Sequence, residues 1–275
     1  MTALSSSAST GLVTVGEAAR RLGVAPITIQ RWVDEGSMRA RRTAGGHRRI
    51  PVLEIRKRLA ISRSDTDRQK LTAWLDGLFS GETSEVAKLL HRARARAGGW
   101  ARVADEVAHA IVELGELWQA GDCSVFEEHR ATESLRRATA ACAAEIPRRR
   151  GAGRALLTTA PDQRHTLGLS LAELVLAERG WTSVWIGEGP PAAEFPAMVA
   201  GLAPDLCIVA APFDTPPKAL RTLQRSLVHA VSETGGLLVL AGQARWSPIK
   251  SGYRCRTFSD LDRVLTDLGP RRVRG

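Results

Sequence analysis

The chain has 275 residues, 44% of them hydrophobic and 25% charged, which is the balance of an ordinary globular protein with room for two or three domains. No apolar run reaches about 18 residues, so the sequence excludes a transmembrane helix and predicts no membrane partner. The net charge is +10, and residues 1–60 carry most of it, with eleven Lys and Arg against four acidic residues. This local excess predicts a polyanion partner for the N-terminal segment.

The first residues and the cysteines bear on where the protein works. Residues 1–11 are rich in Ser, Thr and Ala and lack the regions of a signal peptide, so we expect a disordered leader. The four cysteines, Cys123, Cys142, Cys207 and Cys255, form no Cys-x-x-Cys pair. This spacing argues against a zinc site or a disulfide framework and predicts a cytoplasmic protein.

Two short helices are predicted near the start of the chain. Thr14 and Glu17 form a capping-box pattern that opens the first helix, and Gly23 ends it in a tight turn. Pro26 opens the second helix, because the missing N–H of proline costs nothing at a first helical position. We expect this helix to run to Gly36. Two helices joined by so short a turn form a helix-turn-helix, whose second helix is available to a DNA major groove.

The second of these helices has an apolar side and a polar side. Its expected buried stripe is Ile29, Trp32 and Val33. The outward side chains expected to read base edges are Thr28, Gln30 and Arg31, since Arg and Gln have the fork geometries that guanine and adenine edges require.

A basic hairpin is predicted next, because Gly45-Gly46 stands between two basic extended runs. The side chains expected to contact DNA phosphates are Arg39, Arg41, Arg42, His47, Arg48 and Arg49. The alternatives are a solvated basic surface for the arginines and a hairpin cap for His47. The helices and the Gly-Gly-His-Arg-Arg wing together resemble a MerR-type winged helix-turn-helix DNA-binding domain over residues 12–61, which implies a double-stranded DNA operator as partner.

A helical bundle is predicted after a polar linker over residues 62–70. Residues 71–147 show apolar side chains at three- and four-residue intervals, in a pattern of about four helices. Trp118 closes one helix, and Glu128 and His129 lie in the first turns of the next, which a capping box opens at Ser124. Antiparallel neighbours place these three side chains at the same end of the bundle.

Residues 152–270 are predicted to form a flavodoxin-like parallel α/β domain, because strand and helix patterns alternate. The expected strands are Ala155–Ala160, Trp181–Gly187, Leu206–Ala211 and Leu237–Ala241, with a weaker one at Tyr253–Thr257. The expected helices are Leu167–Arg179, Ala192–Gly201, Lys218–Glu233 and Asp260–Leu268. Ligands of such sheets bind outside the carboxyl ends of the strands, and His165 lies in the first of the loops there.

The segment from Trp118 through Glu128-His129 to the Gln163-Arg-His165-Thr-Leu-Gly168 loop resembles the cobalamin-binding module of the CarH/LitR light-sensor transcription factors. The resemblance covers residues 12 to about 268 in the family's domain order. It implies that adenosylcobalamin is bound, with Trp118 over its upper face and Glu128 against its adenosyl group. It gives His165 the role of lower axial cobalt ligand and His129 that of upper axial ligand after photolysis.

Three positions depart from the family's pattern. Gln163 replaces the acidic residue two positions before the histidine, and Ala210 or Ala211 replaces a small hydroxyl residue. Ala241-Gly242 replaces a Gly-Gly pair. With Gly168 three residues after His165, the small residues Ala211 and Gly242 are still expected to leave room for the cofactor's nucleotide tail.

The function that the resemblance implies is a multi-domain, non-enzymatic transcriptional repressor that senses light. The dark homo-tetramer would hold the operator and dissociate when light removes the adenosyl group, and RNA polymerase is a further candidate partner. One alternative is a regulator of the same fold that does without cobalamin and responds to another ligand, chromophore or protein. The other is an enzyme, since related modules serve methyltransferases and mutases, but the chain has no residues left for a substrate-binding barrel.

Overall fold

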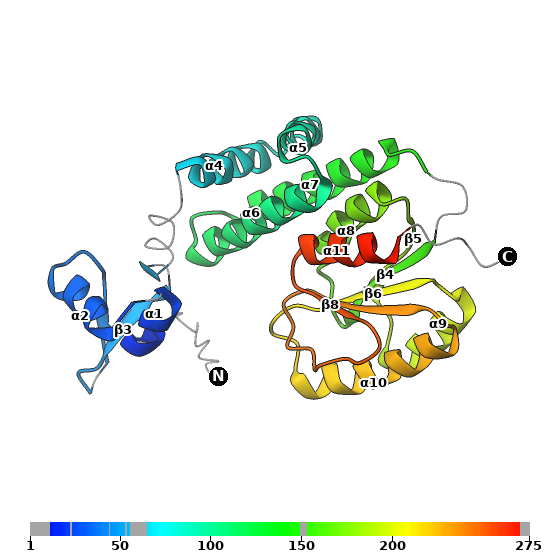
Figure 1. Ribbon diagram of the computed structural model, residues 1–275. Helices are drawn as coiled ribbons and strands as arrows, with labels where there is room; N and C mark the ends of the chain where they lie inside the picture. Colours follow the sequence, from blue (N-terminus) through cyan, green and yellow to red (C-terminus); the bar gives the residue numbers. More distant parts are fainter. Residues whose placement is uncertain are drawn as a thin grey trace, which may run out of the picture. The chain divides into compact units, whose positions relative to one another are not determined.

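The computed structural model of the chain describes residues 12–22, 24–43, 45–52, 54–55, 65–148 and 153–269. They fall into two compact units, one up to Lys70 and one from Leu71 on (Figure 1). Our expectations for the leader, for Gly23 and for the first residues of the linker lie outside the described residues. No helix in these ranges has the length and apolar character needed to cross a lipid bilayer.

The first unit joins two helices to a three-stranded antiparallel sheet of order β1-β3-β2. Its elements are β1 (Leu12–Thr14), α1 (Val15–Leu22), α2 (Pro26–Asp34), β2 (Arg41–Arg42) and β3 (Arg48–Pro51). Its core consists of Ala18, Ala19, Ile29, Met38, Ile50 and Ile55. The predicted helix pair and basic hairpin are confirmed, whereas β1 was missed because three residues are too few to show an alternating pattern.

Local chemistry explains where the first two helices begin and end. The Glu17 main-chain N–H donates to the Thr14 hydroxyl at 3.1 Å, as the capping box predicts. The Glu17 carboxylate pairs with Arg20 and Arg21, one turn on. Helix α2 starts at the predicted proline but ends at Asp34, two residues before Gly36, whose φ of +72° stops the helix.

The linker prediction was wrong from Asp65 on. Helix α4 (Asp65–Ser80) begins there, so residues 65–70 are helical. These residues are polar but include neither Gly nor Pro, and Arg, Gln and Lys are good helix formers, so polarity alone did not indicate coil.

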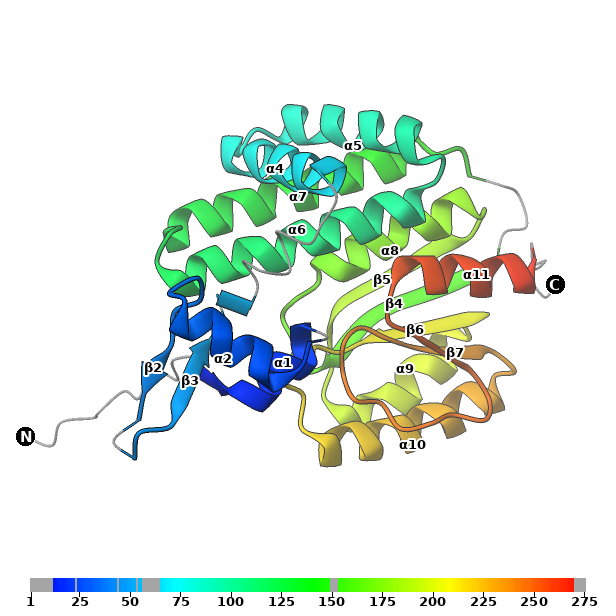
Figure 2. The same cartoon turned by 60° about the vertical axis from the view of Figure 1, so that its left-hand side comes forward.

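Four helices form the bundle of the second unit, and in Figure 2 they lie above the α/β domain. They are α4, α5 (Thr83–Ala97), α6 (Trp100–Ala120) and α7 (Val125–Glu145). The helices are separated at Gly81 and Gly98, whose φ angles of +66° and +77° suit glycine. The capping box at the start of α7 is complete, because the Glu127 N–H donates to the Ser124 hydroxyl and the Ser124 N–H donates to the Glu127 carboxylate.

The α/β domain contains a five-stranded parallel sheet of order β5-β4-β6-β7-β8, which confirms the flavodoxin-like prediction. The strands are β4 (Arg154–Pro161), β5 (Thr182–Gly189), β6 (Leu206–Ala210), β7 (Leu237–Ala241) and β8 (Tyr253–Cys255). The helices are α8 (Leu167–Glu178), α9 (Phe195–Leu202) after a short 3₁₀ turn, α10 (Pro217–Glu233) and α11 (Phe258–Leu268). Helices α8 and α11 cover the face toward the bundle, and α9 and α10 cover the other face (Figures 1 and 2).

The strand sequences explain how both faces of the sheet are buried. On β4, Ala155 and Leu157 belong to the core shared with the bundle, and Leu156 belongs to the core under α9 and α10. On β6, Leu206 and Ile208 face the first core and Cys207 and Val209 the second. This alternation is the two-residue period of a strand, and because both sides are apolar the strands read as continuous hydrophobic runs.

Two carboxylates connect the bundle to the α/β domain. Asp105 on α6 accepts hydrogen bonds from the Phe258 N–H at 2.7 Å, the Ser259 N–H at 3.1 Å and the Ser259 hydroxyl at 2.5 Å. Glu178, at the end of α8, accepts from the Trp100 N–H at 2.9 Å and pairs with Arg94. Because both carboxylates bond to N–H groups in first helical turns, they hold α6 against the sheet domain from two points.

Candidate functional sites

The outer side of α2 and the wing form an exposed basic surface. Gln30 and Arg31 are exposed, and Arg31 forms a long ion pair of 3.7 Å with Glu35. Thr28 is half-buried, so it is less accessible than the sequence suggested. Ile27, which the sequence reasoning missed, is 68% exposed at the second position of α2. An aliphatic side chain on a helix in the major groove can contact the methyl group of thymine.

The wing is a short antiparallel hairpin in which Arg41 pairs with Arg49 and Arg42 with Arg48. The Thr43 N–H donates to the His47 carbonyl at 3.0 Å, and the His47 N–H donates to the Thr43 hydroxyl at 3.2 Å. The main chain of His47 therefore closes the hairpin, while its ring is exposed at the tip.

The six basic wing residues are not equivalent. Arg39, Arg41 and Arg42 are exposed, whereas Arg48 and Arg49 are half-buried. The Arg48 guanidinium pairs with Asp34 at 2.5 Å and approaches the Gln30 carbonyl at 3.5 Å. Arg48 thus connects the wing to α2, and its charge is already balanced within the domain.

A cavity of about 540 Å³ lies between the bundle and the α/β domain. It brings together four of the predicted cofactor residues, Glu128, His129, His165 and Gly168. The rest of its lining comes from α6, α7, the start of α8 and the start of α11: Ala108, Ile111, Thr132, Glu133, Arg136, Arg164, Thr166, Leu167, Leu171 and Phe258. Two histidines from opposite domains therefore line one cavity with a mixed apolar and polar wall.

Thr159 shapes the loop that carries His165, and sequence reasoning missed it. Its hydroxyl donates to the Gln163 carbonyl at 2.7 Å and accepts from the Gly189 N–H at 2.8 Å, so it joins the ends of β4 and β5 to the loop. Asp162 has a φ of +62°, a conformation that Asp tolerates better than most residues. The His165 ring is exposed to the cavity and makes no hydrogen bond within the described part of the chain. Its lone pair is available to a ligand.

The Nδ1 atom of His129 faces two oxygen acceptors. This atom lies 2.9 Å from the Val125 carbonyl and 3.1 Å from the Glu128 carboxylate. Two oxygen acceptors at Nδ1 favour the tautomer that carries the proton there, which leaves the lone pair on Nε2. The Glu128 side chain is 26% exposed and that of His129 76%, so the imidazole extends further into solvent.

Trp118 does not line the cavity, although it lies in the last turn of α6 at the bundle end that carries Glu128. Its side chain is 46% exposed. It follows Ala108, Ile111 and Gly115 along one face of α6, at intervals of three and four residues. A Cβ at Gly115 would meet nothing within 4 Å, so this face of α6 is open between the cavity wall and the indole ring.

Ala211 and Gly242 contact each other at the carboxyl edge of the sheet and lie outside the cavity lining. A Cβ on Gly242, whose φ is +87°, would come within 2.4 Å of the Ala211 carbonyl oxygen. The Ala211 carbonyl in turn accepts from the Ala244 N–H at 3.1 Å. The second glycine of the family pair is therefore required here for backbone approach, whatever the cavity holds.

The surroundings of Glu133 on α7 and of two buried thiols shift their pKa values. Hydrogen bonds from Arg136 and Arg137 lower the pKa of Glu133 to about 2, so the cavity wall near α7 carries a paired carboxylate. Burial raises the pKa of Cys142 to about 11 and that of Cys207 to about 12, so these thiols stay protonated. The four cysteines are free. Among the described residues, no group of three or more His, Cys, Asp or Glu side chains is arranged to hold a bare metal ion.

Two protein families match this chain, one in each unit. Residues 14–50 match the family described as MerR family regulatory protein, and residues 71–143 match the B12 binding domain. A comparison with curated proteins finds no match.

A solved structure shares the fold of the second unit. The monomethylamine corrinoid protein of Methanosarcina barkeri aligns with a TM-score of 0.57 at 14% identity, over 74% of this chain and 99% of that chain. Two others align with lower scores: a cobalamin-binding protein from Desulfitobacterium hafniense DCB-2 (TM-score 0.34, 16% identity, 72% of this chain and 97% of that chain) and the methanol:cobalamin methyltransferase complex MtaBC of Methanosarcina barkeri (0.36, 16%, 77% and 83%). The first of these alignments identifies a corrinoid-protein fold. A MerR family domain precedes the second unit, and a B12 binding domain lies within that unit. This chain therefore has the architecture of a MerR-type regulator with a cobalamin-binding module, as in the CarH group.

Proposed function

We propose that this protein is a transcriptional repressor whose hold on double-stranded DNA is released by light, through adenosylcobalamin bound between the bundle and the α/β domain. The observation that carries the proposal is the pair of imidazoles in one cavity, His165 on the sheet side and His129 on the bundle side. The residues fit the cofactor in donor chemistry, because the His165 imidazole has no hydrogen-bond partner among the described residues and the Nδ1 atom of His129 faces two oxygen acceptors.

Each residue then has a defined task. His165 would offer a nitrogen to cobalt from the α/β side, on a loop held by the Thr159 hydroxyl. Adenosylcobalamin, when bound, supplies a cobalt–carbon bond that light can break. Trp118, on the open face of α6, would cover the cofactor from the bundle side, and Glu128 would accept hydrogen bonds from it. His129 would offer Nε2 to the cobalt from the bundle side when the adenosyl group is absent.

The α6–α7 end of the bundle supports a light-dependent assembly. Val125 and Phe126, the first residues of α7, are 56% and 70% exposed, and Trp118 lies across the turn from them. Exposed apolar side chains at one place are typical of a protein–protein interface. We propose that this end contributes to a dark tetramer, so that any displacement of Trp118 weakens the assembly and removes the avidity of linked DNA-binding units.

On the DNA side, Gln30, Arg31 and Ile27 would reach base edges in the major groove, with Arg39, Arg41 and Arg42 on phosphates. The MerR family domain supports DNA as the partner. Contact with RNA polymerase is consistent with such a regulator, and the cytoplasm is the compartment that this function requires.

The test is an absorption spectrum of the full chain mixed with adenosylcobalamin in the dark and after green light, paired with size-exclusion chromatography and DNA binding. We expect a red complex whose spectrum, size and DNA affinity all change on illumination. A second candidate, the same regulator without cobalamin, is favoured by Gln163, which leaves His165 without a carboxylate partner. A colourless protein after mixing would select that candidate. A red protein with no light response would retain cobalamin and refute light sensing.

A further inference from the structure

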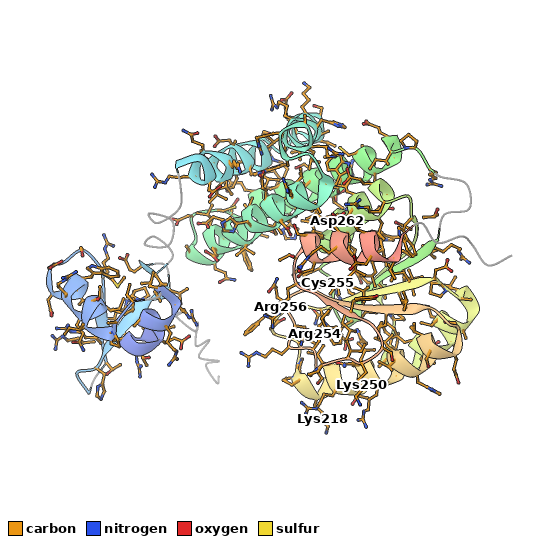
Figure 3. The ribbon with its side chains drawn as sticks, viewed as in Figure 1. Lys218, Lys250, Arg254, Cys255, Arg256 and Asp262 are labelled. Carbon is orange, nitrogen blue, oxygen red and sulfur yellow. The ribbon has the colours of Figure 1, made fainter. Side chains whose placement is uncertain are left out.

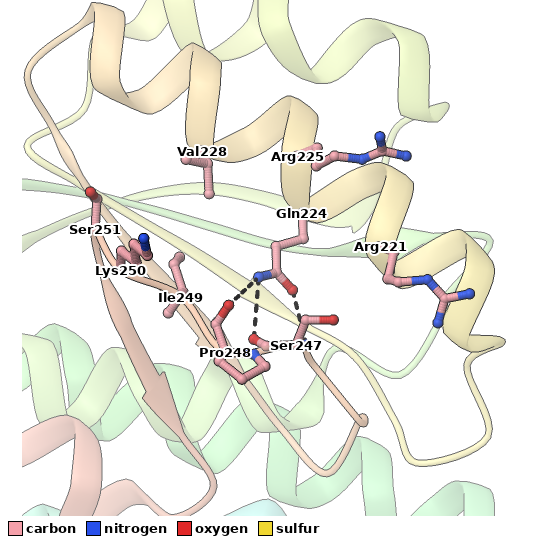
Figure 4. Close-up of a pocket in the computed structure, with 9 residues that line it drawn as sticks. All are labelled: Arg221, Gln224, Arg225, Val228, Ser247, Pro248, Ile249, Lys250 and Ser251. Carbon is pink, nitrogen blue, oxygen red and sulfur yellow. Dashed lines mark hydrogen bonds between the residues drawn. The ribbon is translucent and has the colours of Figure 1, made fainter.

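A second cavity lies on the face of the sheet away from the bundle, with a volume of about 490 Å³ (Figure 4). One wall is helix α10, and the other is the connection from β7 to β8 over residues 242–252. In a doubly wound sheet a helix usually makes such a connection. Here the described chain follows an irregular path, so a hollow remains against α10. Its size falls in the range of small-molecule sites.

The walls of this second cavity are held in place. The Gln224 side chain on α10 is only 8% exposed. Its amide nitrogen donates to the Ser247 and Pro248 carbonyls at 3.2 and 3.3 Å, and its oxygen accepts from the Ser247 N–H at 3.1 Å. Trp246, just before, is buried and donates its indole N–H to the Ala241 carbonyl at 3.0 Å. The cavity is therefore preformed, because the loop is tied to both α10 and the sheet.

The cavity is strongly basic. Arg221 and Arg225 on α10 and Lys250 from the loop line it (Figure 4). Lys218, three residues before Arg221, lies outside the lining and extends the basic stripe along α10 (Figure 3). The lining includes no carboxylate. In the described part of the chain, Arg221, Arg225 and Lys250 take part in no ion pair. Like charges at this spacing destabilise a helix, so the stripe is not explained by the stability of α10.

Some arginines elsewhere in the second unit have acidic partners. Arg136 pairs with Glu133, Arg179 with Asp262 and Arg263 with Asp260. These three arginines are balanced by neighbouring acids, whereas Arg221 and Arg225 on α10 have no such partner among the described residues.

The cavity also has an apolar part. It is lined by Val228, Pro248 and Ile249. In Figure 4 the two arginines lie on one side of Gln224 and Lys250 lies on the other. Guanidinium forks suit a carboxylate or a phosphate, and the aliphatic wall suits hydrocarbon or a ring.

We propose that this cavity binds a small organic anion, with its carboxylate or phosphate at Arg221 and Arg225 and its apolar body along Val228, Pro248 and Ile249. The site shares no lining residue with the histidine cavity, so the anion would be a second ligand of the regulator, independent of cobalamin.

The test is isothermal titration calorimetry of the full chain with 1-naphthoate, 1-naphthyl phosphate, neutral 1-naphthalenemethanol and inorganic phosphate. We expect one site per chain for at least one naphthyl anion, with the tighter of the two identifying the head group. The neutral alcohol and inorganic phosphate should each bind about tenfold more weakly or worse, because each lacks one of the two recognised parts. Binding should be unchanged when cobalamin is present.

Variants assign the site. Arg221→Glu and Arg225→Glu, both at exposed helix positions, should each weaken the naphthyl anion about tenfold. Arg92→Glu, an exposed position on α5, makes the same charge change outside the cavity and should alter the affinity by about twofold or less. Equal losses in all three variants, equal binding of the neutral alcohol, tight binding of inorganic phosphate alone, competition by cobalamin, or no binding of either anion would each overturn the proposal.

Discussion

The wing of the DNA-binding unit offers a sharp test, because two arginines of one hairpin are in different electrostatic states. Arg41 is exposed, and the strand position opposite it is Arg49, so its charge is open to a phosphate. Arg48, one strand over, pairs with Asp34 at 2.5 Å and its side chain is 26% exposed. We therefore expect Arg41→Ala and Arg48→Ala to weaken DNA binding in different ways.

The magnitudes follow from counterion release. Removing one phosphate contact lowers the slope of log K against log salt by about 0.9. Over a fourfold rise in salt, the factor by which Arg41→Ala loses affinity should therefore be about 3.5 times smaller than the factor for the wild type. Arg48→Ala should change the slope by less than about half of that, since Asp34 already balances the charge. It should instead lower the free energy of unfolding by about 0.5–1 kcal/mol, because the partly exposed pair joins the wing to α2.

The assay is fluorescence anisotropy with a random-sequence duplex across a salt series, since sequence-independent binding reports phosphate contacts and needs no known operator. Arg92→Ala on α5 is the matched control and should leave the slope unchanged. The reasoning fails if Arg41→Ala keeps the wild-type slope, or if Arg48→Ala flattens it as much as Arg41→Ala does.

Three further predictions concern the second unit. His165→Ala should abolish uptake of cobalamin or shift its absorption spectrum, because this cavity-lining imidazole is the expected cobalt ligand; wild-type affinity with an unaltered spectrum would exclude that role. Trp118→Ala should weaken the dark assembly in size-exclusion chromatography, whereas His129→Ala should still respond to light but lose the cofactor faster afterwards; wild-type behaviour of both would leave their spacing without function. Asp105→Asn should lower the free energy of unfolding by about 2 kcal/mol in urea titrations, since a carboxylate that accepts three hydrogen bonds at a helix start loses its charge. The exposed change Asp122→Asn should cost under about 0.5 kcal/mol, and equal losses would mean that Asp105 does not connect the domains.

Most of the fold could be predicted because its signals are local. Pro26 and the Ser124 capping box mark helix starts through hydrogen bonds that span three or four residues. The apolar runs of β4 and β6 indicate buried parallel strands because both faces of the sheet are covered. The same locality explains two errors: β1 is too short to show a pattern, and polar residues from Asp65 on form a helix that composition alone did not distinguish from a linker.

The candidate sites were predictable in residue type and only partly in arrangement. The sequence by itself determined that two histidines, a glutamate and a basic wing are present at meaningful spacings. Only the tertiary structure decided that Arg48 forms an ion pair with Asp34 and that Trp118 lies outside the cavity lining. It also decided that the Thr159 hydroxyl binds the loop that carries His165. The α10 stripe likewise became a candidate site only when the β7–β8 loop packed against it. The physical reason is that helix and strand signals depend on neighbours within a few residues, whereas pairing, exposure and cavities depend on residues brought together from distant parts of the chain.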